Sequence, residues 1–83
     1  MIIETKFKPN DLAWYKYEDK WYLCGILDTH ILSWINVKGD ICTEKYHLVY
    51  FKEITGVPPP PVTIKGERRG YVDDDELYEN KGE

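Results

Sequence analysis

Four consecutive carboxylates close to the end of the chain are the residues best suited to chemistry. They lie in the stretch GYVDDDELYEN, residues 70–80, as Asp73, Asp74, Asp75 and Glu76. Carboxylate oxygens are the ligands that hard divalent cations take, so a weak cation site is one interpretation. A solvated acidic face is the ordinary alternative, and docking on the basic surface of a partner is a third. We expect all four side chains to be exposed and treat them as candidate binding residues.

The tyrosine at the head of this stretch adds another interpretation. Residues 71–74, YVDD, spell the Tyr-x-Asp-Asp pattern with which reverse transcriptases hold catalytic magnesium. Such a site needs a further carboxylate from a separate strand and a subdomain around primer, template and nucleotide, and a short motif counts only in that context. A chain of 83 residues cannot enclose it. A calcium-binding loop would require glycine at its sixth position and glutamate at its twelfth. We therefore predict no catalytic residue, no bound metal and no cofactor.

Cysteine and histidine supply a second set of side chains that can bind metals. Cys24, His30, Cys42 and His47 are separated by five, eleven and four residues. Structural zinc sites usually begin with two ligands that are two to four residues apart. Catalysis by cysteine and histidine would need a third group that orients the base. The sequence instead predicts two reduced cysteines and a surface histidine at position 30.

Aromatic residues are dense in the first two thirds of the chain. Successive residues of a strand face opposite sides, so neighbours such as Trp14 and Tyr15 cannot both point into a core. Packing explains part of this density, and a binding face would explain the rest, because exposed rings supply contact area at low entropic cost. We predict that a binding face includes Trp14, Tyr15, Trp21 and Trp34.

Short apolar runs bounded by turn residues must position these side chains. Each run is rich in Ile, Val, Tyr and Trp, and none has helical spacing over three turns. Open strand edges invite aggregation, so we predict an all-β fold closed into a small five-stranded barrel. The predicted strands are residues 12–17, 21–27, 31–37, 41–43 and 48–54.

The composition changes after residue 56. Four prolines at residues 58–61 cannot donate to a sheet ladder and favour extended geometry. They predict either a stiff linker or a polyproline ligand for another protein. A short helix is expected to begin near Asp73, with Leu77 on its inner side. We divide the chain into a small barrel, residues 1–56, and a Pro-rich linker with an acidic tail, residues 57–83, that packs on or extends the barrel.

Residues 7–16, FKPNDLAWYK, and residues 20–27, KWYLCGIL, resemble the opening hairpin of the Tudor and PWWP group of Src-homology-type barrels. That group begins with Phe-x-x-Gly-Asp-Leu-Val-Trp-Ala-Lys and starts its second strand with paired aromatics. Asn10 stands where the group has glycine, and the chain has no Pro-Trp-Trp-Pro. The resemblance covers about a quarter of the chain. It implies that Trp14, Tyr15 and Trp21 frame a ligand groove or aromatic cage, whereas the fold alone does not determine the partner.

Size and charge restrict the function further. The 83 residues are enough for one domain, and the formal net charge is −4, with four basic and seven acidic residues after position 56. No apolar run approaches the roughly 20 residues that span a bilayer, and the charged start differs from a signal peptide. We therefore expect the protein to be cytoplasmic and not to associate with a membrane. The acidic balance argues against direct binding of nucleic acid.

Two hypotheses of function lead, and direct binding of nucleic acid through stacked aromatic rings is a third. The first is a non-enzymatic protein-interaction module that binds a protein partner through an aromatic face, aided by the acidic tail. The alternative is a phage-type inhibitor of host defence or nucleic-acid machinery, whose carboxylates cover a basic site by phosphate mimicry. The two differ in how binding depends on charge.

Overall fold

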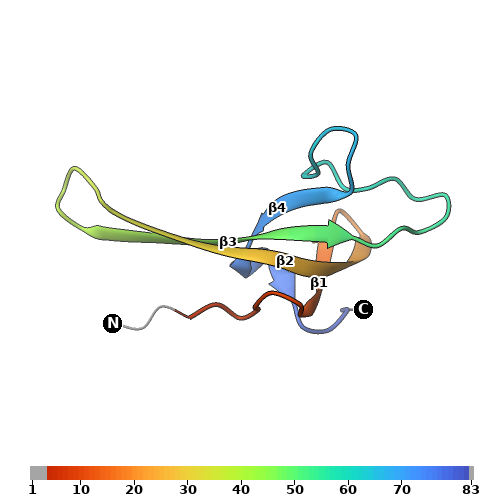
Figure 1. The fold of residues 1–83 in the computed structure, drawn as a ribbon, viewed down its shortest axis with the longest axis horizontal. Helices are drawn as coiled ribbons and strands as arrows, with labels where there is room; N and C mark the ends of the chain where they lie inside the picture. The colour runs from red at the N-terminus through yellow and green to blue at the C-terminus, as the bar shows by residue number, and fades with distance from the viewer. Residues whose placement is uncertain (1–3, 83) are drawn as a thin grey trace.

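The protein is described from residue 4 to residue 82 in a computed structural model, and β-strands are its main regular structure. Its elements are β1 (Leu12–Tyr17), β2 (Lys20–Ile35), β3 (Ile41–Phe51), β4 (Arg69–Asp73), the 3-10 turn η1 (Asp74–Glu76) and β5 (Leu77–Tyr78) (Figure 1). They form one antiparallel sheet in the order β4-β3-β2-β1-β5. The all-β prediction is confirmed. Between residues 4 and 82, no helix is long and apolar enough to cross a membrane.

β1 and β2 form a tight hairpin whose two faces differ. Tyr17 pairs with Lys20 across the turn, where Glu18 adopts a left-handed conformation with φ 51°. Ala13 is buried on the core side, and Trp14, the next residue, lies on the outer side. Every second residue of the hairpin therefore faces the core.

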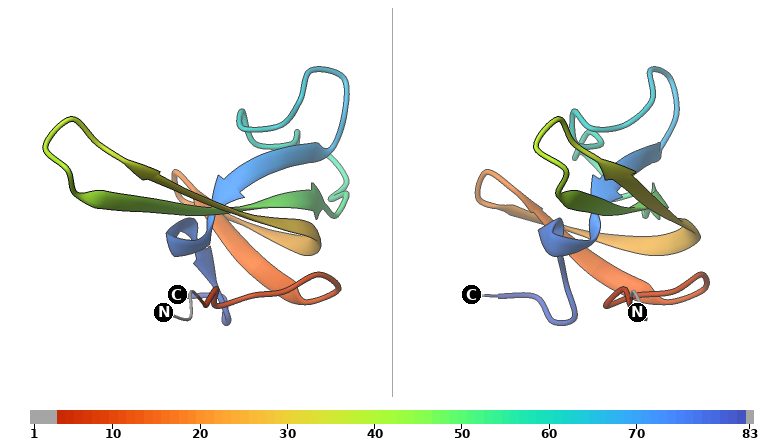
Figure 2. Two further views of the ribbon diagram at one scale, coloured as in Figure 1. Left: turned by 60° about the vertical axis from the view of Figure 1, so that its left-hand side comes forward. Right: turned by 90° about the vertical axis from the view of Figure 1, so that its left-hand side faces the viewer.

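β2 and β3 form a much longer hairpin, which projects from the body of the molecule (Figures 1 and 2). We call residues 28–45, which neither β1 nor β4 flanks, the hairpin arm. At its tip, the Asn36 side-chain oxygen accepts hydrogen bonds from the backbone of Lys38 and Asp40, at 2.9 and 3.0 Å. Gly39 supplies the positive φ of 86° that this turn requires.

The predicted strand breaks at residues 28–30 and 44–47 are wrong, because β2 and β3 run through both of them. The register shifts between Ile26 and Asp28, so Leu27 forms a bulge and the ladder continues beyond it. Glu44 and Lys45 interrupt the apolar pattern without interrupting the strand. Glu44 is exposed on the two-stranded arm, and the Lys45 Nζ donates to the Glu4 carbonyl at 2.8 Å. Polar residues at these positions reflect the open surroundings of the arm and do not mark turns.

The core lies between the curved sheet and the segments that return across it. Phe51 is at its centre, with the rings of Tyr15 and Tyr22 edge-on at 5.6 and 6.2 Å between centroids. Such edge-to-face pairs stabilise a core beyond the area that they bury. The buried apolar side chains are Phe7, Ala13, Tyr15, Tyr22, Cys24, Ile26, Val49, Phe51, Val72 and Leu77.

Residues beyond position 56 supply both edge strands of the sheet. β4 pairs with β3, and β5 pairs with β1. The proline segment is not a free linker, because Pro60 is fully buried and its carbonyl oxygen accepts two hydrogen bonds from Thr63, whereas Pro58 and Pro61 are exposed. Gly70 allows this packing, since a Cβ there would lie 2.6 Å from the carbonyl oxygen of Val62.

The predicted closure into a barrel is wrong. β4 and β5 are consecutive in the chain, yet they lie at opposite ends of the strand order and do not pair with each other. The single turn of η1 joins them. The two residues of β5 pair with β1. Figure 2 shows the resulting open, curved sheet, and the hairpin arm makes the molecule elongated, at 48 × 25 × 23 Å.

Candidate protein-interaction surface

The four aromatic residues predicted for a binding face lie in three different places. Tyr15 is buried in the core, 4% exposed, against Phe51. Trp14 and Trp21 lie half-buried on the outer face of β1 and β2. Trp34 lies on the hairpin arm and is 47% exposed. The structure therefore does not bring these four rings together into one cage.

Trp14 and Trp21 are partly covered by the end of the chain. The Trp21 ring meets the Tyr78 ring edge-on, with 5.4 Å between centroids. The Lys81 ammonium lies 5.7 Å from the Trp14 ring centroid, and the Lys16 ammonium lies 5.5 Å from that of Trp21. These cation–π contacts at an exposed site contribute up to about 1 kcal/mol each. This outer patch is thus engaged within the chain.

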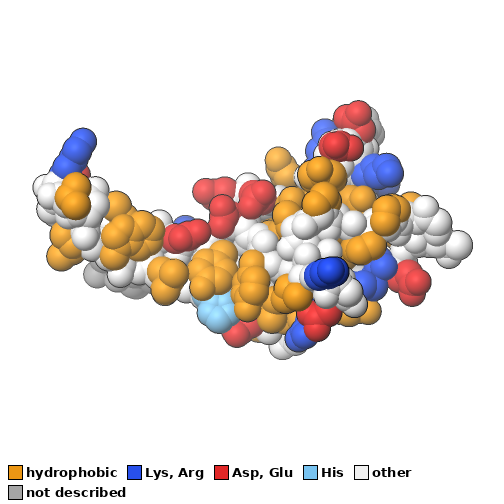
Figure 3. Space-filling model, turned by 90° about the horizontal axis from the view of Figure 1, so that it is seen from above, with side chains coloured by type: hydrophobic (Ala, Val, Ile, Leu, Met, Phe, Trp, Pro, Cys, Tyr) orange, Lys and Arg blue, Asp and Glu red, His pale blue; other side chains and the backbone are white. Residues whose placement is uncertain are grey.

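Trp34 belongs to a different group of side chains, which we call the outer stripe. Its members lie on one face of β2, β3 and β4, as the strand register requires: His30, Leu32, Trp34, Tyr46 and Tyr71. The His30 and Tyr46 rings stack at 5.0 Å, and Tyr71 is edge-on to both. Figure 3 shows hydrophobic side chains running in a row from the projecting hairpin onto the body of the molecule.

The outer stripe is exposed and bordered by carboxylates. Leu32 and Tyr71 are 49% and 52% exposed. Glu44 pairs with Leu32, and Asp73 pairs with Tyr46, so both carboxylates lie on the same face as the rings. Asp28 lies there too, 3.3 Å from the His30 Nε2. An apolar row with acidic neighbours is a surface that a basic, apolar partner would fit.

The opposite face of the hairpin arm is also apolar. Ile31, Ile35 and Ile41 are 43%, 71% and 68% exposed, and Val37 at the tip is fully exposed. Within residues 4–82, each of them keeps a large exposed apolar area. Apolar groups gathered on a projecting element, rather than scattered singly, mark an interaction site.

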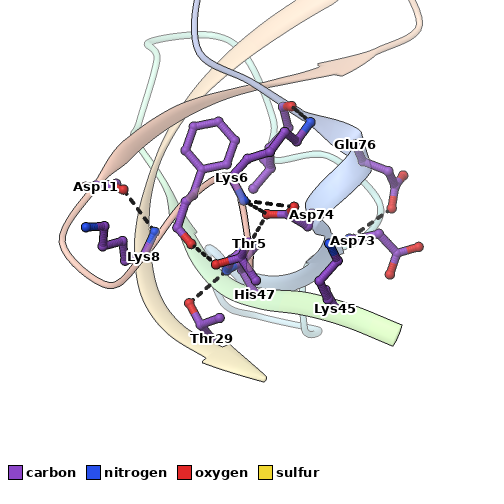
Figure 4. A network of polar contacts seen from close by, with 12 residues as sticks. Thr5, Lys6, Lys8, Asp11, Thr29, Lys45, His47, Asp73, Asp74 and Glu76 are labelled. Atoms are coloured by element: carbon purple, nitrogen blue, oxygen red, sulfur yellow. Dashed lines mark hydrogen bonds and ion pairs between the residues drawn. The ribbon is translucent and has the colours of Figure 1, made fainter. Parts of the chain in front are cut away.

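The predicted acidic surface is only partly correct, because Asp74 is buried. It is 2% exposed, and its Oδ1 accepts a hydrogen bond of 2.6 Å from Nε2 of the fully buried His47. The Lys6 backbone N–H donates to both carboxylate oxygens, at 3.0 and 3.1 Å. On the other side of the imidazole, Nδ1 lies 2.9 Å from the Thr29 hydroxyl (Figure 4). The network ties the N-terminal segment, β2, β3 and η1 together.

The charge state of this network follows from its geometry. Burial acts to raise the pKa of Asp74, but the hydrogen bonds from His47 and the Lys6 backbone outweigh it, so the pKa lies below its usual value. The carboxylate is then ionised and can only accept, which makes Nε2 the donor. The second hydrogen bond of the ring joins Nδ1 to the Thr29 hydroxyl, which can serve as donor or acceptor. Every polar atom of the group has a partner, and the group acts as a structural connection.

The other three carboxylates are exposed, as predicted. Asp73, Asp75 and Glu76 surround η1, and Glu76 accepts a hydrogen bond of 3.1 Å from the Asp73 backbone. This bond is half of the reciprocal capping arrangement typical of helix starts. The predicted helix therefore exists only as one 3-10 turn, and Leu77 is buried directly after it.

The cysteine and histidine residues do not converge. Cys24 faces the core, where its thiol donates to the Ala13 carbonyl and burial raises its pKa to about 12. Cys42 lies on the hairpin arm beside Trp34, away from the buried His47. Among residues 4–82, no three metal-binding side chains are arranged to hold an ion, and no pocket opens on the surface. Recognition by this part of the chain would use its surface.

Trp34 was predicted from the sequence as a binding residue, whereas the other members of the outer stripe were not. His30, Leu32 and Trp34 alternate with Ile31 and Ser33, so an uninterrupted strand would have placed all three on one face. Comparison with known proteins gives no matching family model and no match among curated proteins or solved structures.

Proposed function

We propose that this chain is a non-enzymatic protein-interaction module that binds a protein partner through the outer stripe. One observation carries the proposal: a hairpin extends beyond the core and holds exposed apolar and aromatic side chains in a row. The arm adds little to the core, because its residues are absent from the buried cluster. A partner that covers the row would supply the burial that the chain itself does not.

The chemistry of the outer stripe indicates the kind of partner. Trp34 and Tyr71 are aromatic anchors of the type that dominates protein interfaces. Asp28, Glu44 and Asp73 border them, and the formal net charge of the chain is −4. We therefore propose a partner segment with apolar side chains flanked by lysine or arginine. The carboxylates would mainly speed encounter and fix orientation, and the rings would slow dissociation.

We further propose that the sheet is an open relative of the Src-homology-type barrels. Support comes from the strand order β4-β3-β2-β1-β5, with a 3-10 turn between β4 and β5. The long arm and the missing pairing between β4 and β5 are departures from a compact closed barrel. This proposal concerns ancestry of the fold and adds nothing about the partner.

The alternative, an inhibitor that covers a basic site by phosphate mimicry, has weaker support. One of its four carboxylates, Asp74, is buried and occupied by His47. The remaining carboxylates around η1 number three, a small imitation of a nucleic acid. Mimicry predicts binding that nearly vanishes at high salt, whereas an aromatic anchor predicts binding that persists.

A site-specific photo-crosslinker tests the proposal. A benzophenone side chain at Trp34 should label one main protein, other than a second copy of this chain, in cells that naturally contain the chain. The matched control carries the same group at Ile64, which is 42% exposed on the loop before β4. The labelled protein, once purified, should bind the unmodified chain, and Tyr71→Ala should weaken that binding. Equal labelling from both positions, or a purified protein that does not bind, would overturn the proposal.

A further inference from the structure

Among residues 4–82, nothing pairs with the backbone edge of β2 along the hairpin arm. β1 pairs with residues 20–25 of β2, and Ile26 exchanges backbone hydrogen bonds with Asn10 and Asp11. From Asp28 to Ile35, β2 pairs with β3 alone, and no other backbone-to-backbone hydrogen bond reaches these residues from the described chain. About 26 Å of strand therefore has one free row of N–H and C=O groups.

This edge also lacks the features that prevent strands from pairing with other chains. Charged residues, proline and short length are the usual protections. Residues 29–37, THILSWINV, contain no Asp, Glu, Lys, Arg or Pro. By contrast, β5 has two residues, β4 is bridged by Thr63 at Gly70, and the free edge of β3 carries Glu44 and Lys45. The β2 edge is the unprotected one.

We propose that two copies of this chain associate through the β2 edge, with the two β2 strands antiparallel about a two-fold axis at Ser33. The occupant of the edge is therefore a second copy of the same chain. This association uses backbone groups at an edge, which the proposed binding of a protein partner does not need. It also brings Leu32 and Trp34 of the outer stripe beside the second copy.

The side chains of β2 match themselves in this register. With Ser33 opposite its own copy, Leu32 lies opposite Trp34 of the second copy on the outer face. Ile31 lies opposite Ile35 of the second copy on the other face. All four are 43 to 71% exposed in the single chain, so they have apolar area to lose. Aromatic and β-branched pairs of this kind stabilise antiparallel strands.

The edge of β3 offers no such match. An axis at Thr43 would set Ile41 opposite Lys45 of the second copy, and Cys42 opposite Glu44. Each apolar or thiol side chain would then face a charge. Once the β2 edges are paired, the edges left on the arms are those of β3, with Glu44 and Lys45. The assembly therefore stops at two copies, as a closed two-fold dimer does.

Cysteine crosslinking distinguishes the two edges. In a Cys42→Ser background, Ser33→Cys places two thiols one strand spacing apart across the proposed axis, about 5 Å. Thr43→Cys is the matched control, because Thr43 pairs with Ser33 in the hairpin and is equally exposed. Its thiols would be three strand spacings apart, about 14 Å. Under oxidation with copper–phenanthroline, Ser33→Cys should give a covalent dimer and Thr43→Cys should remain mainly monomeric.

Sedimentation of the unmodified chain provides an independent measurement. An interface this small is typical of weak association, so we expect a monomer–dimer equilibrium with a dissociation constant on the order of micromolar. Ile35→Lys should raise that constant about tenfold or more, because it places a charge on the paired edge. Ile41→Lys, at the cross-strand neighbour that is 68% exposed, should change it little.

Each other outcome overturns the proposal. Preferential crosslinking of Thr43→Cys would assign the interface to β3. Equal effects of the two lysine variants would indicate association through an apolar face rather than an edge. The chain could also sediment as a monomer at concentrations up to about a hundredfold above the expected dissociation constant, with no Ser33→Cys crosslink. The β2 edge would then not bind a second copy of the chain.

Discussion

At the scale of single residues, Asp74 is where an isosteric change should harm the fold most. Asp74→Asn removes the charge and places an amide N–H₂ against a donor, either the Lys6 backbone or His47. A buried charge-assisted hydrogen bond lost in this way costs about 2 to 3 kcal/mol of unfolding free energy. Denaturant unfolding at pH 7 measures the change. Asp75→Asn, at the exposed neighbour, should alter stability by less than about 0.5 kcal/mol.

The same carboxylate should make stability depend on pH. Its pKa is lowered in the folded chain, so the unfolded chain binds more protons at acid pH, and stability rises with pH in that range. The contribution is fully present above the unfolded pKa, about 3.9. It is lost as the pH falls below that value through the folded pKa. Unfolding between pH 6 and pH 2 should show a steeper loss for the natural chain than for Asp74→Asn, and equal slopes would contradict this.

The burial of Asp74 shows what the sequence could not indicate. Four adjacent carboxylates have the same local pattern, and the one that turns inward is selected by partners 27 and 68 residues away. Tyr15 was misjudged for a similar reason, since alternation separates it from Trp14 without saying which of the two faces the core. Trp34 could be named because the dense aromatic residues lie on alternating strand faces and cannot all point into one core.

Trp34 itself should matter for binding and hardly at all for folding. Trp34→Ala truncates a side chain that is 47% exposed on the arm, so we expect less than about 1 kcal/mol of lost stability. Affinity for the crosslinked partner should fall by about 2 kcal/mol, mostly through faster dissociation. Surface plasmon resonance separates the two rates. Ile64→Ala is the control, and an equal loss for both variants would exclude Trp34 as an anchor.

At the scale of elements, the sequence indicated the strand type well and the strand ends poorly. β1 was predicted at its observed bounds, and the turn at residues 38–40 was recognised from Lys-Gly-Asp. Asp28 and Thr29, which follow the bulge at Leu27, and the charged pair Glu44 and Lys45 were read as breaks. A turn and a bulge share the same residue types, and only the pairing partner distinguishes them. β5 was missed because two residues carry no periodic signal.

The hairpin arm should be removable without loss of the fold. Replacing residues 33–43 with Asn-Gly would join Leu32 to Glu44, which pair in the natural hairpin, through a two-residue turn. None of the removed residues belongs to the buried cluster, so unfolding free energy should change by less than about 1 kcal/mol. Partner binding and self-association should both disappear. Cooperative unfolding lost together with the arm would mean that the arm is part of the core.

At the scale of the whole molecule, stability should depend on the part of the chain after residue 56. Val72 and Leu77 are buried in the same cluster as Phe51, and they reach it only through β4 and β5. A chain that ends at residue 56 would expose that cluster and leave both β1 and β3 as open edges. Small domains have little stability to spare, since total values are about 5 to 15 kcal/mol. We therefore expect residues 1–56 alone to show no cooperative thermal transition and no slowly exchanging amides.

Residues 57–83, added as a separate peptide, should restore amide protection in β1 and β3. The reason is that the two pieces can still pack together when the peptide bond at position 56 is absent. Protected amides in residues 12–51 without the peptide would instead make the first 56 residues an independent domain.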